Sequence, residues 1–212
     1  MELKPTDIVL ALMQFLEILL PGALVAFVSN AQAGKYVFGP QQILPAIAGE
    51  AQGWVIFFFA SYLLGHFVFL IASFLDDYAY NPVRERWKPL TKDLAYQRAT
   101  SIKRRRLHDD KQEIVNTFQW AKARLNLEHP SALAEIKRNE SDSKFFRSLV
   151  IVFFAFAILE FSQGRSVSGV GCLAFSALSF LRYVDQRWKS TQIAYIHLIA
   201  MEDLGRGRPQ TE

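Results

Sequence analysis

Cysteine and familiar catalytic motifs are almost absent from this sequence. Cys172 stands alone among 212 residues, so no disulfide can form within the chain and no metal site can rest on a cysteine cluster. The sequence also has no Walker loop, no HExxH zinc motif, no GxSxG nucleophile and no dinucleotide-binding glycine pattern. These absences argue against an enzyme, and they point to no cofactor and no metal ion.

Charged side chains are nearly missing from four long stretches, which are residues 8–28, 53–75, about 148–163 and 166–183. The second stretch has no formally charged residue in 23 positions. At about 1.5 Å per residue it is ~34 Å long, enough to cross the ~30 Å hydrocarbon core of a bilayer. Its fourteen Leu, Ile, Phe and Val residues favour insertion by roughly 4 to 8 kcal/mol before polar costs. The sequence therefore predicts an all-α polytopic membrane protein with four transmembrane helices and a helical cytoplasmic region.

Basic residues are concentrated between the second and third stretches. Residues 76–147 hold 16 of the 24 Lys and Arg residues against 11 Asp and Glu. The segments predicted on the other side hold only Lys35 and Arg165 as basic residues. Because Lys and Arg are retained in the cytoplasm, we expect both termini inside, an N-in and C-in topology. Topology also explains the net charge of +4, so nucleic acid is not an expected partner.

This pattern divides the chain into four parts. We expect a first transmembrane hairpin in residues 1–75, a basic helical cytoplasmic region in residues 76–147, a second hairpin in residues 148–183, and a cytoplasmic helix and tail in residues 184–212. Ala31 and Ala33 resemble a signal-peptide cleavage site. The acidic residues before the first apolar stretch and the length of that stretch favour a retained span.

The basic region is predicted to be helical throughout. We expect helices near residues 91–109 and 110–126, and a third that begins at Pro130, because proline suits a first helical position, and continues into the third span. Two prolines, Pro82 and Pro89, are expected to end the second membrane helix. In the C-terminal helix, Ile193, Ile196 and Ala200 recur at helical spacing and are expected to pack on the basic region.

Two ionisable residues fall near the centres of predicted spans. An acid at the depth of Glu17 costs on the order of 3 kcal/mol, and an ionisable residue there is a functional hypothesis by default. His66 lies at a similar depth in the neighbouring span, so the two residues are candidates for a polar pair or an ion path. The structural alternative is that they only hydrogen-bond to hold two helices together. Tyr62, Ser73 and Asp77 share the helix face of His66.

Small and helix-bending residues mark expected packing surfaces. Pro21 removes the hydrogen bond to the carbonyl of Glu17, so a kink is expected there, and Gly22 adds flexibility. Ser61 and Gly65 form a small-xxx-small pair on which another helix can pack closely. The fourth span carries a similar stripe, made of Ser168, Cys172, Ser176 and Ser179.

Two clusters beyond the second span are candidates for ligand binding. An anionic lipid or another anionic ligand could be bound by the basic residues Arg84, Arg86, Lys88, Lys103, Arg104, Arg105 and Arg106. Simple solvation of these charges is the alternative. Asp76 and Asp77 suggest the acidic sites with which membrane enzymes bind a metal–diphosphate, but a second acidic cluster is missing, and helix-end capping is favoured.

Two segments, residues 63–87 and 118–149, resemble uncharacterised bacterial four-span inner-membrane proteins. Some members of that group are associated with defence-type neighbourhoods, so the resemblance implies an anti-phage setting. It also implies a location in the bacterial inner membrane. It carries no activity and no catalytic residue to transfer.

These observations lead to one expected function and two alternatives. We expect an oligomeric inner-membrane protein that forms a pore or perturbs the bilayer and is controlled through its cytoplasmic helices. Its expected partners are the lipid bilayer, further copies of the chain, and a cytoplasmic protein or a nucleotide ligand. The first alternative is a membrane anchor that recruits a soluble partner. The second is a lipid-modifying enzyme.

Overall fold

The computed structural model describes residues 5–32, 50–107 and 115–206. Every regular element in these residues is a helix. The elements are α1 (Pro5–Gln32), α2 (Glu50–Leu75), η1 (Asp76–Tyr80), α3 (Asn81–Trp87), η2 (Leu90–Lys92), α4 (Leu94–Leu107), α5 (Thr117–Glu128), α6 (Pro130–Ser162) and α7 (Ser166–Arg206). Four of the helices are long and apolar enough to cross a membrane. The predicted all-helical fold with four candidate membrane spans is therefore confirmed.

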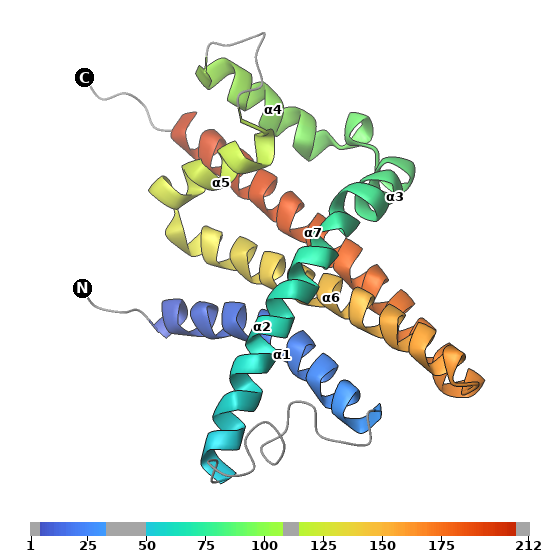
Figure 1. Cartoon of the computed structure of the whole chain (residues 1–212). Coiled ribbons are helices and arrows are strands. Elements are labelled where there is room, and N and C mark those ends of the chain that lie inside the picture. Colours follow the sequence, from blue (N-terminus) through green and yellow to red (C-terminus); the bar gives the residue numbers. More distant parts are fainter. Residues whose placement is uncertain (1–4, 33–49, 108–114, 207–212) are drawn as a thin grey trace.

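The two longest helices, α6 and α7, form an antiparallel hairpin against which α1, α2, α4 and α5 pack (Figure 1). The turn between them places Gly164 at φ 74°, a left-handed conformation that glycine adopts without a steric cost. Helix α6 begins at Pro130 and runs unbroken to Ser162, as the sequence predicts. Helix α7 continues for 41 residues, about 62 Å at 1.5 Å per residue.

The first hairpin packs against this pair in a different way. Helix α1 lies beside α6, while α2 crosses α1 and α6 (Figure 1). Glycines allow the crossing of α1 and α2, because a Cβ atom at Gly22 would collide with the carbonyl of Ser61, and one at Gly65 with the carbonyl of Ile18. The two backbones touch at this point, which is the close approach that small residues permit between membrane helices.

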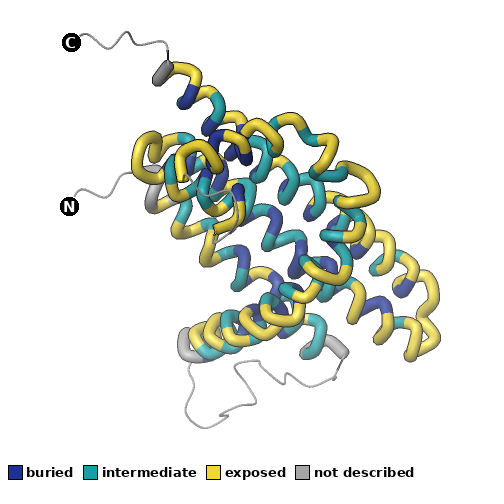
Figure 2. Tube along the Cα trace, turned by 90° about the horizontal axis from the view of Figure 1, so that it is seen from above, coloured by how far each residue is buried: buried dark blue, intermediate teal, exposed yellow. Residues whose placement is uncertain are grey.

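A small hydrophobic core holds the shorter helices together at one end of the long hairpin. Its buried members are Ala99, Ala121, Leu125, Ile136, Ala194, Tyr195 and Leu198. They come from α4, α5, the first half of α6 and the second half of α7, which together we call the helical cap. Figure 2 shows the buried residues toward the middle of the molecule and exposed residues along the outer sides of the helices. The cap core is built only because α6 and α7 each extend beyond their apolar halves.

The second span does not end at Pro82, contrary to the prediction. Helix α2 continues through one π turn, η1, into α3, where the N–H of Asn81 donates to the carbonyl of Asp76. Pro82 lies in the first turn of α3, where a missing N–H costs little. Only after Trp87 does the helix end, with Pro89 in extended conformation two residues later.

Two further expectations about the cap helices are corrected. Helix α5 begins at Thr117, because Asn116 caps it by accepting a hydrogen bond from the N–H of Gln119 at 2.7 Å, and residues 108–114 lie outside the described residues. In α7, Ile196 and Ala200 are exposed. The residues of α7 that are buried in the cap core are Ala194, Tyr195 and Leu198. Ile193, the third residue of the predicted face, does pack against this core, so the helix and one of its three expected contacts were predicted correctly.

Candidate functional site

Three helices are joined at a single acidic residue, Asp76. Its carboxylate accepts hydrogen bonds from the Arg147 guanidinium on α6 and from the Tyr183 hydroxyl on α7. Both partners are buried. These three residues, which we call the Asp76 node, lie where three of the apolar stretches end. The node therefore aligns the ends of the apolar parts of α2, α6 and α7 with one another.

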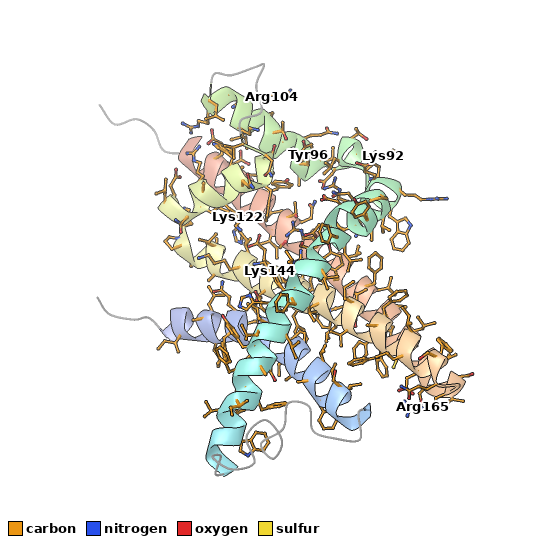
Figure 3. The ribbon with its side chains drawn as sticks, viewed as in Figure 1. Lys92, Tyr96, Arg104, Lys122, Lys144 and Arg165 are labelled. Atoms are coloured by element: carbon orange, nitrogen blue, oxygen red, sulfur yellow. The ribbon has the colours of Figure 1, made fainter. Side chains whose placement is uncertain are left out.

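A polar cleft of about 300 Å³ opens beside the node. Its walls are η1 and α3, the first residues of α4 and α5, and the middle of α7. Tyr96, labelled in Figure 3, lies on the α4 wall with its ring centroid 5.9 Å from that of Tyr195 on α7. The residues most important to its chemistry are Arg84, Lys88, Asp93, Arg187, Gln192 and Tyr195.

The three cations of the cleft have no carboxylate partner among the described residues. Arg84, Lys88 and Arg187 form no ion pair there, and the buried Nε of Arg84 has no hydrogen-bond partner. The Arg84 guanidinium carbon lies 5.8 Å from the centroid of the Tyr80 ring, and Lys88 Nζ lies 3.4 Å from the centroid of the Trp188 ring. Aromatic faces hold a cation in place without neutralising it. These side chains keep N–H groups available to an anion.

The acids of the cleft, in contrast, already accept hydrogen bonds from other groups of the protein. Asp93 accepts hydrogen bonds from the backbone N–H groups of Ala95 at 3.0 Å and Tyr96 at 3.2 Å, and its second oxygen accepts one from Gln192. Asp77 accepts from Asn81 at 3.4 Å, and Asp76 belongs to the node. Formal charges in the lining are balanced, with three acids against three cations, but each acid accepts at least one hydrogen bond whereas the cations have no carboxylate partner among the described residues. The cleft is suited to an anion and not to a cation.

Buried tyrosines contribute neutral donors to the same cleft. Tyr80 and Tyr195 are both buried, and the ordinary pKa of a phenol is about 10. Both phenols therefore stay protonated at physiological pH and able to donate a hydrogen bond.

The predicted intramembrane pair is not formed. Glu17 is buried and accepts a hydrogen bond from Ser141 on α6. His66 is exposed on α2, with its ring centroid 4.6 Å from that of Tyr62. No ion pair or hydrogen bond joins Glu17 to His66 in the described chain. The partner of Glu17 lies on the polar half of α6 because α1 runs alongside α6.

Among the other residues of the expected polar stripe, Tyr62 contacts His66, whereas Ser73 and Asp77 are placed separately. Tyr62 stacks on Phe15 of α1 with a centroid distance of 5.7 Å. Ser73 donates to the carbonyl of Leu70 in its own helix at 2.6 Å, and Asp77 lines the cleft. Helix α1 is continuous through Pro21, which is fully buried. The predicted kink stays a prediction.

All but one of the small residues that sequence analysis assigned to helix packing lie between helices of the same chain. Ser61 and Gly65 are at the crossing of α1 and α2. In α7, Ser176 and Ser179 are buried, and the Ser176 hydroxyl donates to the carbonyl of Val150 on α6 at 3.0 Å. Cys172 packs against the cluster that contains Val152 and Phe156, whereas Ser168 is exposed.

The basic residues predicted to form one patch divide into separate groups. Arg84 and Lys88 line the cleft, and Arg86 is exposed beside them. Farther along, Lys103 is buried and donates to the carbonyl of Val115, and Arg106 pairs with Glu202 at 2.9 Å. Arg104, labelled in Figure 3, and Arg105 are exposed.

The acidic pair does not resemble a metal site. Asp76 is committed to Arg147 and Tyr183. Across the parts of the chain that are described, no group of three or more His, Cys, Asp and Glu residues is placed to hold a metal ion. The geometry gives no support to a lipid-modifying enzyme that uses a metal–diphosphate.

Sequence reasoning missed several residues of this site. Arg147, Tyr183, Arg187, Asp93 and Gln192 were not grouped with Asp76 or Arg84. One signal was available, because Asp76, Arg147 and Tyr183 each mark the end of a charge-poor stretch, so the three had to lie at a similar level. Nothing in the spacing of Asp93 and Gln192 indicates that they meet.

Comparisons with protein-family models, with curated proteins and with solved structures gave no match for this chain. The geometry of the polar cleft is therefore the main basis for a functional proposal.

Proposed function

We propose that the protein is a multi-pass membrane protein controlled from its cytoplasmic side by an anionic ligand bound in the polar cleft. The observation that carries this proposal is the set of three cations, Arg84, Lys88 and Arg187, that line the cleft without a carboxylate partner in the described residues. An arginine fork and a lysine ammonium are the usual protein donors to phosphate oxygens.

The position of the cleft supports a role in control. Two of its walls, α3 and α7, are continuous with candidate spans: α2 leads into α3 through η1, and α7 is one helix from Ser166 to Arg206. The other walls belong to the helical cap. An anion held by Arg84 on α3 and Arg187 on α7 favours the arrangement in which these helices are close. Ligand binding thereby acts on helices that extend into the bilayer.

The response that we propose is assembly of several copies into a pore or another bilayer-perturbing structure. His66 supports it, because this ionisable side chain is exposed on α2 among apolar neighbours such as Phe67 and Leu70. A polar group on a lipid-facing surface is costly unless a further helix or water covers it. Four helices alone enclose no wide channel, so the proposal requires more than one protomer in a bacterial inner membrane, with both termini inside.

A membrane anchor that recruits a soluble partner is the second candidate. It is favoured by a groove of about 350 Å³ on the cap. Its apolar lining comes from α5, α6 and α7 and includes Leu125, Ala132, Met201 and Leu204, and Leu204 is 73% exposed. Such a groove is suited to the apolar face of a partner helix.

The test uses the full chain in detergent micelles and in liposomes. Inorganic pyrophosphate, ADP and phosphatidylglycerol are titrated separately while thermal unfolding is followed, and dye leakage is measured in the liposomes. We expect at least one anion to raise the melting temperature of the wild type and not that of Arg84→Gln/Arg187→Gln. The control, Arg105→Gln/Arg138→Gln, removes two exposed cations outside the cleft. Equal responses in all three proteins, or no response to any anion, would refute control through the cleft.

The leakage measurement separates the two candidates. A controlled pore or bilayer-perturbing protein changes dye release when the anion is added. A membrane anchor binds the anion and leaves the liposomes sealed.

A further inference from the structure

An apolar groove of about 140 Å³ continues from the polar cleft. The two spaces share Tyr80, Arg84, Lys88 and Trp188. Beyond these shared residues the groove is lined by the apolar side chains of Val83, Trp87, Leu181 and Val184 and by Asp185, which forms ion pairs with Arg182 and Lys189. Arg84 and Lys88 thus lie between the polar cleft and the mainly apolar groove.

The groove lies at the level where the apolar part of α7 ends. Leu181 precedes Tyr183 of the Asp76 node by two residues, and its side chain is half exposed. Trp87, on the opposite wall, is 65% exposed. Tryptophan is typical of the headgroup level of a bilayer. With the apolar parts of α2 and α7 in a bilayer, as proposed, this level places the groove beside the acyl chains and the cleft beside the headgroups.

From this juxtaposition we infer that the ligand of the polar cleft is an anionic glycerophospholipid of the cytoplasmic leaflet. This inference rests on the proposed function of the cleft. Its phosphate accepts hydrogen bonds from Arg84, Lys88 and Arg187. The first part of an acyl chain fills the apolar groove between Val83 and Leu181, and the remainder stays in the bilayer. A soluble phosphate compound would use only the polar half of this paired site.

The chemistry of the cleft also selects among lipids. Trp188 and Tyr80 are already in contact with Lys88 and Arg84, so no aromatic cage is left for the quaternary ammonium of phosphatidylcholine. The hydrogen-bonding groups near the cations, Tyr80, Thr191 and Gln192, suit a hydroxyl-bearing or unsubstituted anionic headgroup. We therefore expect phosphatidylglycerol to bind and phosphatidylcholine not to compete with it.

The experiment measures binding of four probes to the full chain in a neutral detergent: phosphatidylglycerol, phosphatidylcholine, deacylated glycerophosphoglycerol and inorganic phosphate. Lipids retained on the protein are counted by native mass spectrometry, and dissociation constants are obtained by titration. We expect phosphatidylglycerol to bind on the order of tenfold more tightly than the other three, because losing one group of contacts costs about that factor. Glycerophosphoglycerol and inorganic phosphate lack the apolar contact, and phosphatidylcholine lacks the headgroup hydrogen bonds.

Two variants locate the binding. Arg84→Gln/Arg187→Gln is expected to weaken phosphatidylglycerol binding by about tenfold or more, while Arg105→Gln/Arg138→Gln leaves it unchanged. Val184→Phe fills the groove and is expected to weaken binding of the lipid without changing that of inorganic phosphate. If the Arg84 variant does not fold, the comparison of wild type with Val184→Phe still decides the question.

The outcomes distinguish this inference from the proposed function. Equal binding of glycerophosphoglycerol and phosphatidylglycerol would overturn the lipid assignment and keep an anion site. Tight binding of inorganic phosphate alone would also overturn the lipid assignment and keep an anion site. If phosphatidylglycerol binds equally to wild type and to both variants, it binds elsewhere, and the inference is wrong. If none of the probes binds and the pyrophosphate and ADP titrations are also negative, the inference and the proposed anion site both fail.

Discussion

Arg147 on α6 forms an ion pair with Asp76 at the end of α2, and the Arg147 side chain is only 7% exposed. The two residues are far apart in sequence, and the Tyr183 hydroxyl occupies the other oxygen of the same carboxylate. A charge removed from solvent in this way is tolerated only because its partner is present. The ion pair thus makes the position of α2 depend on that of the α6–α7 hairpin.

Replacement of Asp76 is expected to destabilise the protein strongly. Asp76→Asn keeps the shape of the side chain and leaves the Arg147 guanidinium buried without a counter-charge, which costs about 3 kcal/mol. Asp77→Asn is the matched control, because Asp77 is exposed and its change should cost less than about 0.5 kcal/mol. Thermal and urea unfolding in detergent, followed by circular dichroism, measures both. Equal stability of the two variants would contradict a structural role for the node.

Added methyl groups at the crossing of α1 and α2 are expected to force these helices apart. Gly22→Ala and Gly65→Ala place a Cβ atom against a backbone carbonyl, and overpacking of this kind costs about 1–3 kcal/mol. Gly171→Ala is the control, because a Cβ atom there meets nothing within 4 Å. The measurement is unfolding in detergent together with disulfide trapping between cysteines introduced on α1 and α2. Unchanged stability and trapping in the first two variants would show that the crossing is not as close as described.

Glu17 and Ser141 are expected to be energetically coupled. In a double-mutant cycle with Glu17→Gln and Ser141→Ala, the coupling should be about 1 kcal/mol, the size of one hydrogen bond. Ser73→Ala provides a control cycle with Glu17→Gln, since Ser73 donates within its own helix, and those two changes should add within ~0.5 kcal/mol. If Glu17 couples instead to His66→Leu, the original prediction of a Glu–His pair regains support.

Apolar replacement of the two ionisable residues tests the functional proposals directly. Glu17→Leu and His66→Leu should each reduce ligand-dependent dye release if the spans assemble into a pore or perturb the bilayer. The reduction should be larger for His66, which is exposed on α2, than for Glu17, which is buried within the protomer. An anchor keeps its partner binding in both variants. Retained dye release in His66→Leu would argue against an assembly surface at this residue.

Much of the fold could be predicted because the charge-poor stretches locate the four helices that are able to cross a membrane. The ends of these stretches fall at Asp76, Arg147 and Tyr183, and the structure joins these same residues. The start of α6 at Pro130 also follows from local chemistry, since proline suits a first helical position.

Helix faces and partners were harder to predict than helices. Helix α7 has apolar residues on several sides, so the recurrence of Ile196 did not identify the side that the cap buries, where Leu198 lies. The partner of Glu17 depends on how far α1 is displaced along α6, and nothing in the local sequence of either helix fixes that displacement. For the same reason the sequence indicated that Ser176 packs against a helix without indicating that the helix is α6.

The π turn between α2 and α3 controls the direction in which the cleft's cations point. In η1 the hydrogen bond from Asn81 reaches back five residues to Asp76, one more than in an α-helix, so everything after it is rotated by about 100° relative to an uninterrupted helix. Deleting a single amino acid from that turn would restore regular winding and swing Arg84 and Lys88 around the helix axis, away from Arg187. The rotation between the exposed apolar side chains of α2 and the cations of the cleft is thus set by one inserted residue.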